Sequence, residues 1–146
     1  MMAERIALTD ELRSLMKAHA GETYPEECCG LIFGITTDEG TAVIRDVVQI
    51  MNHDGRKNKH YEINPLELFS HEKAQREIGN DILGFYHSHP DQPSIPSDED
   101  IREMISEMVY LIISVPEGKP ARLRAWKKVQ GFGHVQELMI FQSEPY

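Results

Sequence analysis

One segment of the sequence, an apolar run followed by two histidines, three prolines and a helix signal, restricts the fold more than any other. The apolar run 82–85 predicts a buried strand, and His87 and His89 fall at its end. Successive side chains of an extended chain point to opposite faces, so we expect His87 and His89 to project to the same face. The prolines that follow disfavour a helix. The next helix is therefore expected to begin near Ser97, with Asp100 in its first turn.

The two histidines and Asp100 have two competing interpretations. A catalytic zinc site takes three protein ligands from His, Asp, Glu or Cys and leaves its fourth position to water, and His87, His89 and Asp100 would complete such a set. In the other interpretation, Ser97 and Asp100 form an ordinary N-terminal capping pattern, and the histidines serve packing or hydrogen bonding. Each motif taken alone favours the second interpretation, and only their combination favours a metal site.

This combination resembles the signature of the JAMM (MPN-plus) metalloprotease family. The signature consists of His-x-His, seven residues that begin with proline, Ser, two residues and Asp, and His87, His89, Ser97 and Asp100 match its spacing throughout. The resemblance extends over nearly the whole chain. It implies a compact domain with a curved central sheet flanked by helices, a site at the end of the third strand, and Zn²⁺ held by the two histidines and Asp100.

Hydrolysis at such a site also needs a proton acceptor beside the attacking water, and a carboxylate usually supplies it. In the JAMM family this base is a glutamate at the start of the first strand. The segment 24–34 resembles that region, and the alignment through Gly30 and Gly34 points to Glu27, with Glu26 as the competitor. Neighbours on a strand face opposite ways, so only one of the two is expected to reach the metal. Without the histidine motif, Glu26 and Glu27 would be interpreted as two solvent-exposed acids at the start of a strand.

Two serines of the motif have further expected roles. The resemblance implies that Ser97 hydrogen-bonds the developing oxyanion of the tetrahedral intermediate, although one hydroxyl is not expected to do this and also cap the helix. Ser88 matches a Ser/Thr position of the family but faces away from the metal, so it can act only through its neighbours. The remaining histidines lack ligand spacing and are expected to be exposed or hydrogen-bonded, namely His19, His53, His60, His71 and His134.

The resemblance implies a zinc-dependent peptidase or isopeptidase with Glu27 as the base. The short chain looks most like the stand-alone prokaryotic members, some of which cleave after the Gly-Gly tail of ubiquitin-like or sulfur-carrier proteins. Such a tail is therefore the expected substrate. A non-catalytic binding scaffold is one alternative, and a non-haem iron oxygenase with two histidines and one carboxylate is another. A nucleobase deaminase would need a Pro-Cys-x-x-Cys ligand motif, which the sequence lacks.

Composition limits the remaining classes of function. The 146 residues are expected to form one domain, 1–146. The formal net charge of −9 argues against a nucleic-acid partner. No signal-peptide profile and no run long enough to span a bilayer is present, so we predict a cytoplasmic protein without a membrane partner. The adjacent Cys28 and Cys29 cannot build a disulfide framework and are expected to be reduced residues of the interior.

The sequence patterns predict an α+β (mixed α/β) domain with about six strands and three helices. The first helix, from Thr9 as N-cap to Gly21, is indicated by helical spacing of Leu8, Leu12, Leu15, Met16 and His19. The apolar segment 24–34, which forms a hairpin with 41–50, is followed by a polar loop, 52–59, and a second helix, 64–79. The third helix is expected to end near Met108, and the remaining strands are 109–115, 121–129 and 135–141, the last two joined across 131–133.

Overall fold

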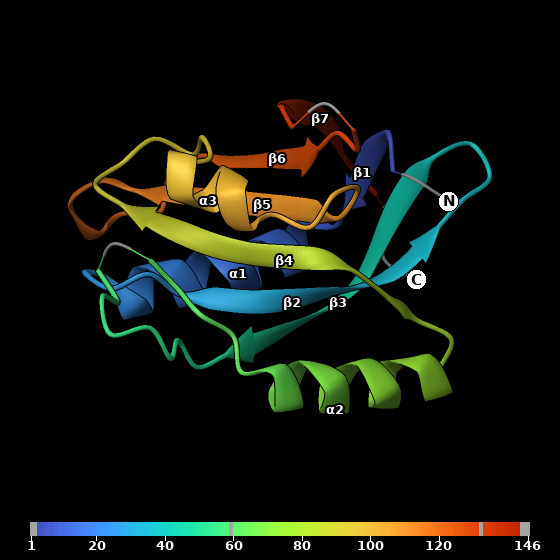
Figure 1. The fold of residues 1–146 in the computed structure, drawn as a ribbon, viewed down its shortest axis with the longest axis horizontal. Helices are drawn as coiled ribbons and strands as arrows, with labels where there is room; N and C mark the ends of the chain where they lie inside the picture. The colour runs from blue at the N-terminus through green and yellow to red at the C-terminus, as the bar shows by residue number, and fades with distance from the viewer. Residues whose placement is uncertain (1–2, 59, 132, 144–146) are drawn as a thin grey trace.

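The computed structural model describes residues 3–58, 60–131 and 133–143. Met1, Met2, Lys59 of the predicted polar loop and Phe132 of the predicted connection lie outside these residues. Figure 1 shows the elements, which follow one another as β1 (Arg5–Leu8), α1 (Asp10–Thr23), β2 (Cys29–Thr36), β3 (Thr41–Ile50), α2 (Pro65–Glu77), β4 (Asp81–Pro90), α3 (Asp98–Glu103), β5 (Val109–Val115), the 3-10 helix η1 (Pro116–Gly118), β6 (Leu123–Lys128) and β7 (Val135–Gln142).

The strands of the described chain close into a barrel in the order β1-β3-β2-β4-β5-β6-β7. β1 closes it by pairing in parallel with both β3 and β7. β4 and β5 are also parallel, whereas the other neighbouring pairs are antiparallel. The predicted α+β class, the mixed sheet and the flanking helices agree with this structure. The prediction of about six strands is wrong, because the described residues contain seven and their sheet is closed.

The strand that the sequence analysis missed is β1. It has only four residues, and the helical spacing of Leu8 with Leu12 assigns the end of this strand to the first helix. In the structure Leu8 is fully buried in β1. The helix begins after Thr9, whose hydroxyl accepts a hydrogen bond from the Leu12 N–H at 3.2 Å, as predicted for an N-cap. A strand this short cannot be recognised from the sequence when its last residue also fits the apolar spacing of the helix that follows.

β4 lies between β2 and β5 and carries both histidines of the predicted site. Its parallel register places His87 opposite Ile112 and His89 opposite Ser114 of β5. The strand continues to Pro90, so both histidines lie within its last residues. β5 is buried along its whole length.

The two faces of the sheet support separate hydrophobic clusters. One cluster contains Met16 of α1, which lies behind β2 and β4 in Figure 1. The other contains Phe85 of β4 and is covered by Leu68 of α2 and by residues next to α3. Because side chains alternate along a strand, His87 and His89 lie on the same face as Phe85. The site therefore opens on the side of the sheet that carries α2 and α3.

α3 is shorter than predicted and ends at Glu103 instead of near Met108. Met104 leaves the helical conformation with ψ of 133° and buries its side chain against the second cluster. The N–H of Ile105 then donates to the Tyr110 hydroxyl at 2.8 Å. Burial of Met104 and this hydrogen bond to β5 stop the helix, and neither can be read from the apolar spacing alone.

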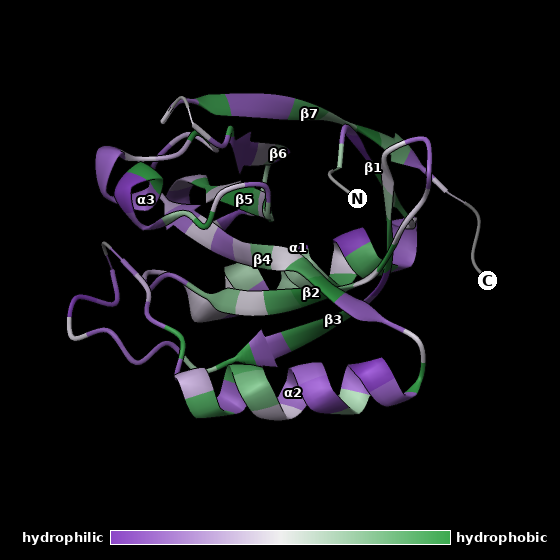
Figure 2. Ribbon diagram, turned by 45° about the vertical axis from the view of Figure 1, so that its right-hand side comes forward, coloured by the Kyte–Doolittle hydropathy of each residue, from purple (hydrophilic) through white to green (hydrophobic). Residues whose placement is uncertain are grey.

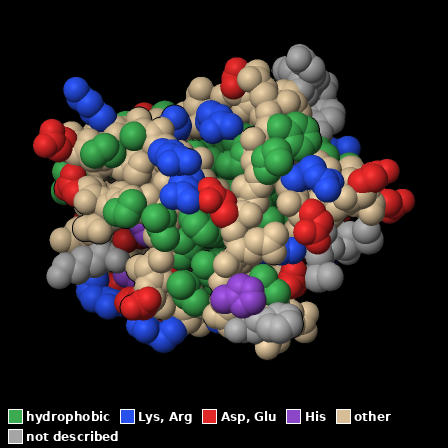
Figure 3. Space-filling view, turned by 90° about the horizontal axis from the view of Figure 1, so that it is seen from above, with side chains coloured by type: hydrophobic (Ala, Val, Ile, Leu, Met, Phe, Trp, Pro, Cys, Tyr) green, Lys and Arg blue, Asp and Glu red, His purple; other side chains and the backbone are tan. Residues whose placement is uncertain are grey.

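β6 and β7 close the barrel on the side shown in Figure 3. Arg124 and Glu137 join these strands through two hydrogen bonds of 2.7 and 2.6 Å. Acidic and basic side chains are interspersed with hydrophobic ones on this face (Figure 3), and Met139 and Phe141 of β7 are exposed.

Cys28 and Cys29 are buried and free, as predicted. The loop between β3 and α2 is mostly hydrophilic (Figure 2), as its sequence indicates. None of the described helices has the length and apolar composition required to cross a bilayer.

Candidate metal centre

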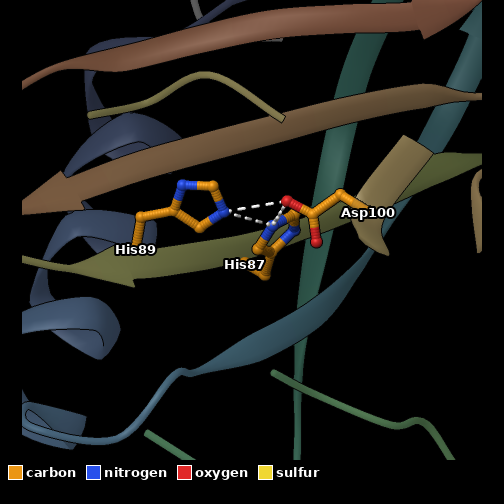
Figure 4. Close-up of side chains that lie close together, drawn as sticks. All are labelled: His87, His89 and Asp100. Atoms are coloured by element: carbon orange, nitrogen blue, oxygen red, sulfur yellow. Dashed lines mark hydrogen bonds and ion pairs between the residues drawn. The ribbon is translucent and has the colours of Figure 1, made fainter. Parts of the chain in front are cut away.

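Three side chains of the predicted site meet between the end of β4 and the start of α3 (Figure 4). Nε2 of His87 lies 3.2 Å from Nε2 of His89, and Oδ2 of Asp100 lies 3.3 Å from the first nitrogen and 2.9 Å from the second. All three residues are buried. Within the described part of the chain, they form the one group of three or more His, Cys, Asp or Glu side chains that could hold a metal ion.

Local backbone structure orients two of these side chains. Nδ1 of His89 lies 2.8 Å from the carbonyl oxygen of Pro93, and because a carbonyl only accepts, this nitrogen carries a proton and Nε2 faces Asp100. Oδ2 of Asp100 accepts from the Ser97 N–H at 2.9 Å, while the Ser97 hydroxyl accepts from the Asp100 N–H at 3.0 Å. The capping interpretation and the metal interpretation therefore apply to the same carboxylate.

The spacing of the three atoms fits a tetrahedral metal ion. With bonds of about 2.0–2.1 Å, two ligand atoms of a tetrahedral zinc site lie about 3.3 Å apart. The observed separations of 2.9 to 3.3 Å are close to this value. Two imidazole nitrogens and one carboxylate oxygen are also a ligand set that catalytic zinc sites use, with water in the fourth position. The residues present therefore fit a zinc ion.

The protonation states of the three side chains are set by burial and by their contacts. Burial lowers the pKa of His87. Burial alone would lower the pKa of His89 as well, but the hydrogen bond and charge of Asp100 raise it above its usual value. Burial alone would raise the pKa of Asp100, yet the hydrogen bonds from His87 and His89 hold it well below its usual range. Asp100 is thus ionised and ready to bind a cation.

Glu27 lies just before β2, and its backbone is held on both sides. Its N–H donates to the carbonyl of Lys57 at 2.5 Å, and its carbonyl accepts from Nδ2 of Asn52 at 3.0 Å. The next N–H, of Cys28, donates to the Ser88 hydroxyl at 2.8 Å. These bonds fix the position from which the Glu27 carboxylate extends.

The Glu27 carboxylate is buried and lines the same cleft as His89 of the cluster. Its Oε1 has no hydrogen-bond partner among the described residues. Burial raises the pKa of Glu27 to about 8, although the charge of His89 acts in the opposite direction. A bound dication would lower this value again. A carboxyl group that titrates near neutral pH is suited to accept and return a proton.

Two cavities distinguish Glu27 from Glu26. A cleft of about 630 Å³ is lined by Glu27, His89, Ser97 and the proline-rich loop. A second cavity of about 380 Å³ is lined by both glutamates and by the end of α1. Glu26 is exposed and does not line the first cleft. The geometry therefore favours Glu27, as the sequence alignment does.

Ser97 lies at the edge of this cleft with an exposed side chain. Its oxygen accepts the Asp100 N–H as the N-cap of α3. A serine hydroxyl has one proton to donate and two lone pairs, so the cap leaves the proton available. Capping therefore does not use the proton that oxyanion binding would need.

Histidines outside the motif include two that are hydrogen-bonded, as predicted. Nδ1 of His19 lies 2.7 Å from the Tyr86 hydroxyl, and Nε2 of His60 lies 2.6 Å from Oε2 of Glu103. Ser88 is fully buried and contacts Cys28 instead of the clustered side chains, which agrees with its expected indirect role.

Two residues next to the site were not singled out from the sequence. Asn52 donates to the Glu27 carbonyl, and the Tyr61 ring stacks on His87 with centroids 4.5 Å apart. Asn52 is the first residue of the predicted polar loop 52–59, and Tyr61 lies just after that loop. An aromatic residue beside a polar loop is a weak signal for Tyr61, and no pattern in the sequence indicates the partners of Asn52.

Comparison with known proteins supports the proposed similarity. Residues 9–129 match the family model for prokaryotic homologs of the JAB domain. The chain is 34% identical over 125 residues to desampylase of Haloferax volcanii, covering 82% of this chain and 86% of that protein. It is 30% identical over 115 residues to a probable TtuB-protein conjugate cleaving protease of Thermus thermophilus, covering 73% and 74%.

A solved structure has a fold similar to that of this chain. The solution structure of a protein from Desulfitobacterium hafniense superposes with a TM-score of 0.83 at 32% sequence identity, covering 95% of this chain and 93% of the other. The family predicted from the histidine motif is thus confirmed by a match that includes Glu27 and all three clustered side chains within its bounds. The chain belongs to the family of prokaryotic homologs of the JAB domain.

Proposed function

We propose that this protein is a zinc-dependent hydrolase that cleaves a peptide or isopeptide bond after the Gly-Gly tail of a ubiquitin-like or sulfur-carrier protein. The observation that carries the proposal is the convergence of His87, His89 and Asp100, with donor atoms 2.9 to 3.3 Å apart, beside the buried Glu27 carboxylate. His87, His89 and Asp100 would hold the ion.

Each residue of the site has a distinct role in this proposal. A zinc ion bound there would act as a Lewis acid, which lowers the pKa of a bound water to about 7 and polarises a carbonyl. Glu27 accepts the proton of the attacking water at its carboxylate and later passes it to the leaving amine. The Ser97 hydroxyl donates a hydrogen bond to the oxyanion of the tetrahedral intermediate. The proline-rich loop and Glu27 line the cleft in which the scissile bond would lie.

The relatives support the substrate class. One is named desampylase and the other a probable protease that cleaves TtuB-protein conjugates, and the alignments cover most of each protein. Both names describe removal of a protein modifier. We therefore propose a conjugate of a small ubiquitin-like protein as the substrate of this chain.

The direct test uses a ubiquitin-like carrier protein extended by a short peptide beyond its Gly-Gly terminus. The zinc-loaded protein is incubated with this substrate, and the masses of the products are measured. Cleavage directly after the second glycine is expected. A protein that holds one zinc ion per chain and leaves a panel of such conjugates uncut would overturn the proposal in favour of a binding scaffold.

The two adjacent glutamates provide a matched test of the proton acceptor. Glu27→Gln keeps the size of the side chain but removes its basicity, so kcat should fall by about 10²–10⁴-fold while the zinc content is retained. Glu26→Gln should cleave at the parental rate, because Glu26 does not line the cleft. Equal rates for the two variants would show that Glu27 is not the base.

A further inference from the structure

Asn52 is the second residue after β3. Its side chain is buried, and all four hydrogen-bonding positions of its amide are used. Nδ2 donates to the carbonyls of Glu27 at 3.0 Å and His60 at 2.9 Å. Oδ1 accepts from the N–H groups of Asp54 and Glu62, each at 3.0 Å. Every partner is a backbone group, so the amide acts as a fixed junction between chain segments.

These backbone groups belong to two segments that flank the site. One is the segment just before β2, which carries Glu27. The other is the loop between β3 and α2, which carries Tyr61 between two of the residues that Asn52 holds. The Tyr61 ring stacks on His87, with planes inclined by 27°. A single side chain thus holds the backbone of Glu27 and the backbone on either side of Tyr61, whose ring stacks on His87.

A second set of contacts fastens the same loop to α3. Arg56 forms an ion pair of 3.1 Å with Glu99, and His60 lies 2.6 Å from Glu103. Asp100 lies between these two acids in the first turns of α3. The loop that Asn52 organises therefore contacts the helix that carries the third clustered side chain.

We infer that Asn52 is a positioning residue, which sets Glu27 and the Tyr61–His87 pair relative to each other, and so tunes both metal affinity and turnover. This inference rests on the function proposed above. Asn52 also borders the second cavity next to Glu27, but it acts through its backbone partners. Without its amide, the segment before β2 and the loop lose the hydrogen bonds that join them, while the proposed ligands and base remain present.

Two variants separate this role from simple loss of folding. Asn52→Leu has similar size and removes all four hydrogen bonds. Asn52→Asp keeps the two acceptors toward the loop but, when ionised, places a negative charge against the carbonyls of Glu27 and His60. The matched control is Asn80→Leu. Asn80, which lies between α2 and β4, is also buried. Its side chain contacts Gln75 of α2 and Arg45 of β3.

Zinc affinity is measured for the full-length variants by competition with a chelator, and kcat and KM are measured at saturating zinc below the thermal midpoint of every variant. Partners that orient metal ligands typically change affinity or activity by about 10–100-fold. We expect Asn52→Leu to weaken zinc binding by about this factor and to lower kcat more than it changes KM, and Asn52→Asp to lower kcat. Asn80→Leu should lose thermal stability but keep parental zinc affinity and kcat.

The inference is overturned if both Asn52 variants, while folded, match Asn80→Leu in zinc affinity and in kcat. Failure of the proposed function gives a different result, in which the parental protein binds zinc but cuts no conjugate. In that case the zinc affinities alone still decide the role of Asn52, because weaker binding by Asn52→Leu than by Asn80→Leu supports it and equal binding rejects it.

Discussion

The ring of Tyr61 lies against the ring of His87, with centroids 4.5 Å apart and planes inclined by 27°. His87 is only 1% exposed, and its Nδ1 has no hydrogen-bond partner among the described residues. His89, in contrast, is oriented by the Pro93 carbonyl. The two histidines are therefore held by different forces, one by stacking and the other by a hydrogen bond.

Replacement of Tyr61 should reveal the contribution of this stacking. Tyr61→Phe keeps the ring and should bind zinc as tightly as the parental protein. Tyr61→Leu removes an aromatic pair, which is worth about 0.5–1.5 kcal/mol beyond the buried area, and should weaken both zinc binding and folding. Chelator competition and urea unfolding of the metal-free protein measure these effects. Parental zinc affinity in Tyr61→Leu would mean that the stacking does not orient His87.

Loss of the charge of Asp100 should abolish metal binding without removing the helix cap. The amide oxygen of Asp100→Asn can still accept from the Ser97 N–H, but it provides no anionic ligand. Zinc affinity should fall by more than the roughly 10–100-fold that is typical of residues behind the ligands. Asp98→Asn, in the same helical turn but exposed, is the control and should keep its zinc. Metal analysis of the parental protein after metal-free purification also distinguishes zinc from iron.

Gly30 should tolerate no side chain, because of Tyr86. A Cβ atom at Gly30 would lie 2.0 Å from Cε2 and 2.3 Å from Cζ of the buried Tyr86 ring. The ring cannot withdraw easily, since its hydroxyl is 2.7 Å from His19. Gly30→Ala should therefore lower the free energy of unfolding by about 3 kcal/mol or more. At Gly55 a Cβ would meet no atom within 4 Å, and Gly55→Ala should change stability by less than about 0.5 kcal/mol. Similar denaturation curves for both variants would contradict the packing argument.

Stability at acidic pH should depend on the pair that joins β6 and β7. Hydrogen bonds from Arg124 lower the pKa of Glu137 below its usual value of 4.5. A carboxyl group with a lower pKa in the folded state stabilises the protein above the unfolded pKa, and this contribution is lost as the pH falls through the folded value. Glu137→Gln should therefore be less stable at neutral pH by at most about 1 kcal/mol, because the pair is partly exposed. The difference from the parental protein should shrink below about pH 4.5, and a difference independent of pH would refute this account.

The convergence of His87, His89 and Asp100 could be predicted because it depends on local geometry. The alternation of a strand places His87 and His89 on one face, and the prolines delay the helix so that Asp100 falls in its first turn. Both effects act within one continuous segment. Glu27 required the resemblance to a family, because nothing local connects it to residues sixty positions later in the chain.

The remaining features depend on tertiary contacts that the hydrophobic pattern of the sequence does not show. β1 joins β3 and β7, which come from opposite parts of the chain, so the closure of the barrel has no local signal. The early end of α3 follows from the burial of Met104 and from the Tyr110 hydroxyl. The partners of Asn52 are backbone groups, whose positions the side-chain pattern does not encode.

The closed order of the strands also limits how an extended peptide can be recognised. Many proteins capture a peptide by adding it as an extra strand to an open sheet edge. Throughout the described chain every strand, including β4 with its histidines, has a neighbour on each side. A peptide therefore cannot be added along β4 where β2 and β5 flank it. Among the described strands an open edge lies instead on β3 beyond Val43, where the pairing with β1 ends, so strand addition there would occur away from the histidines.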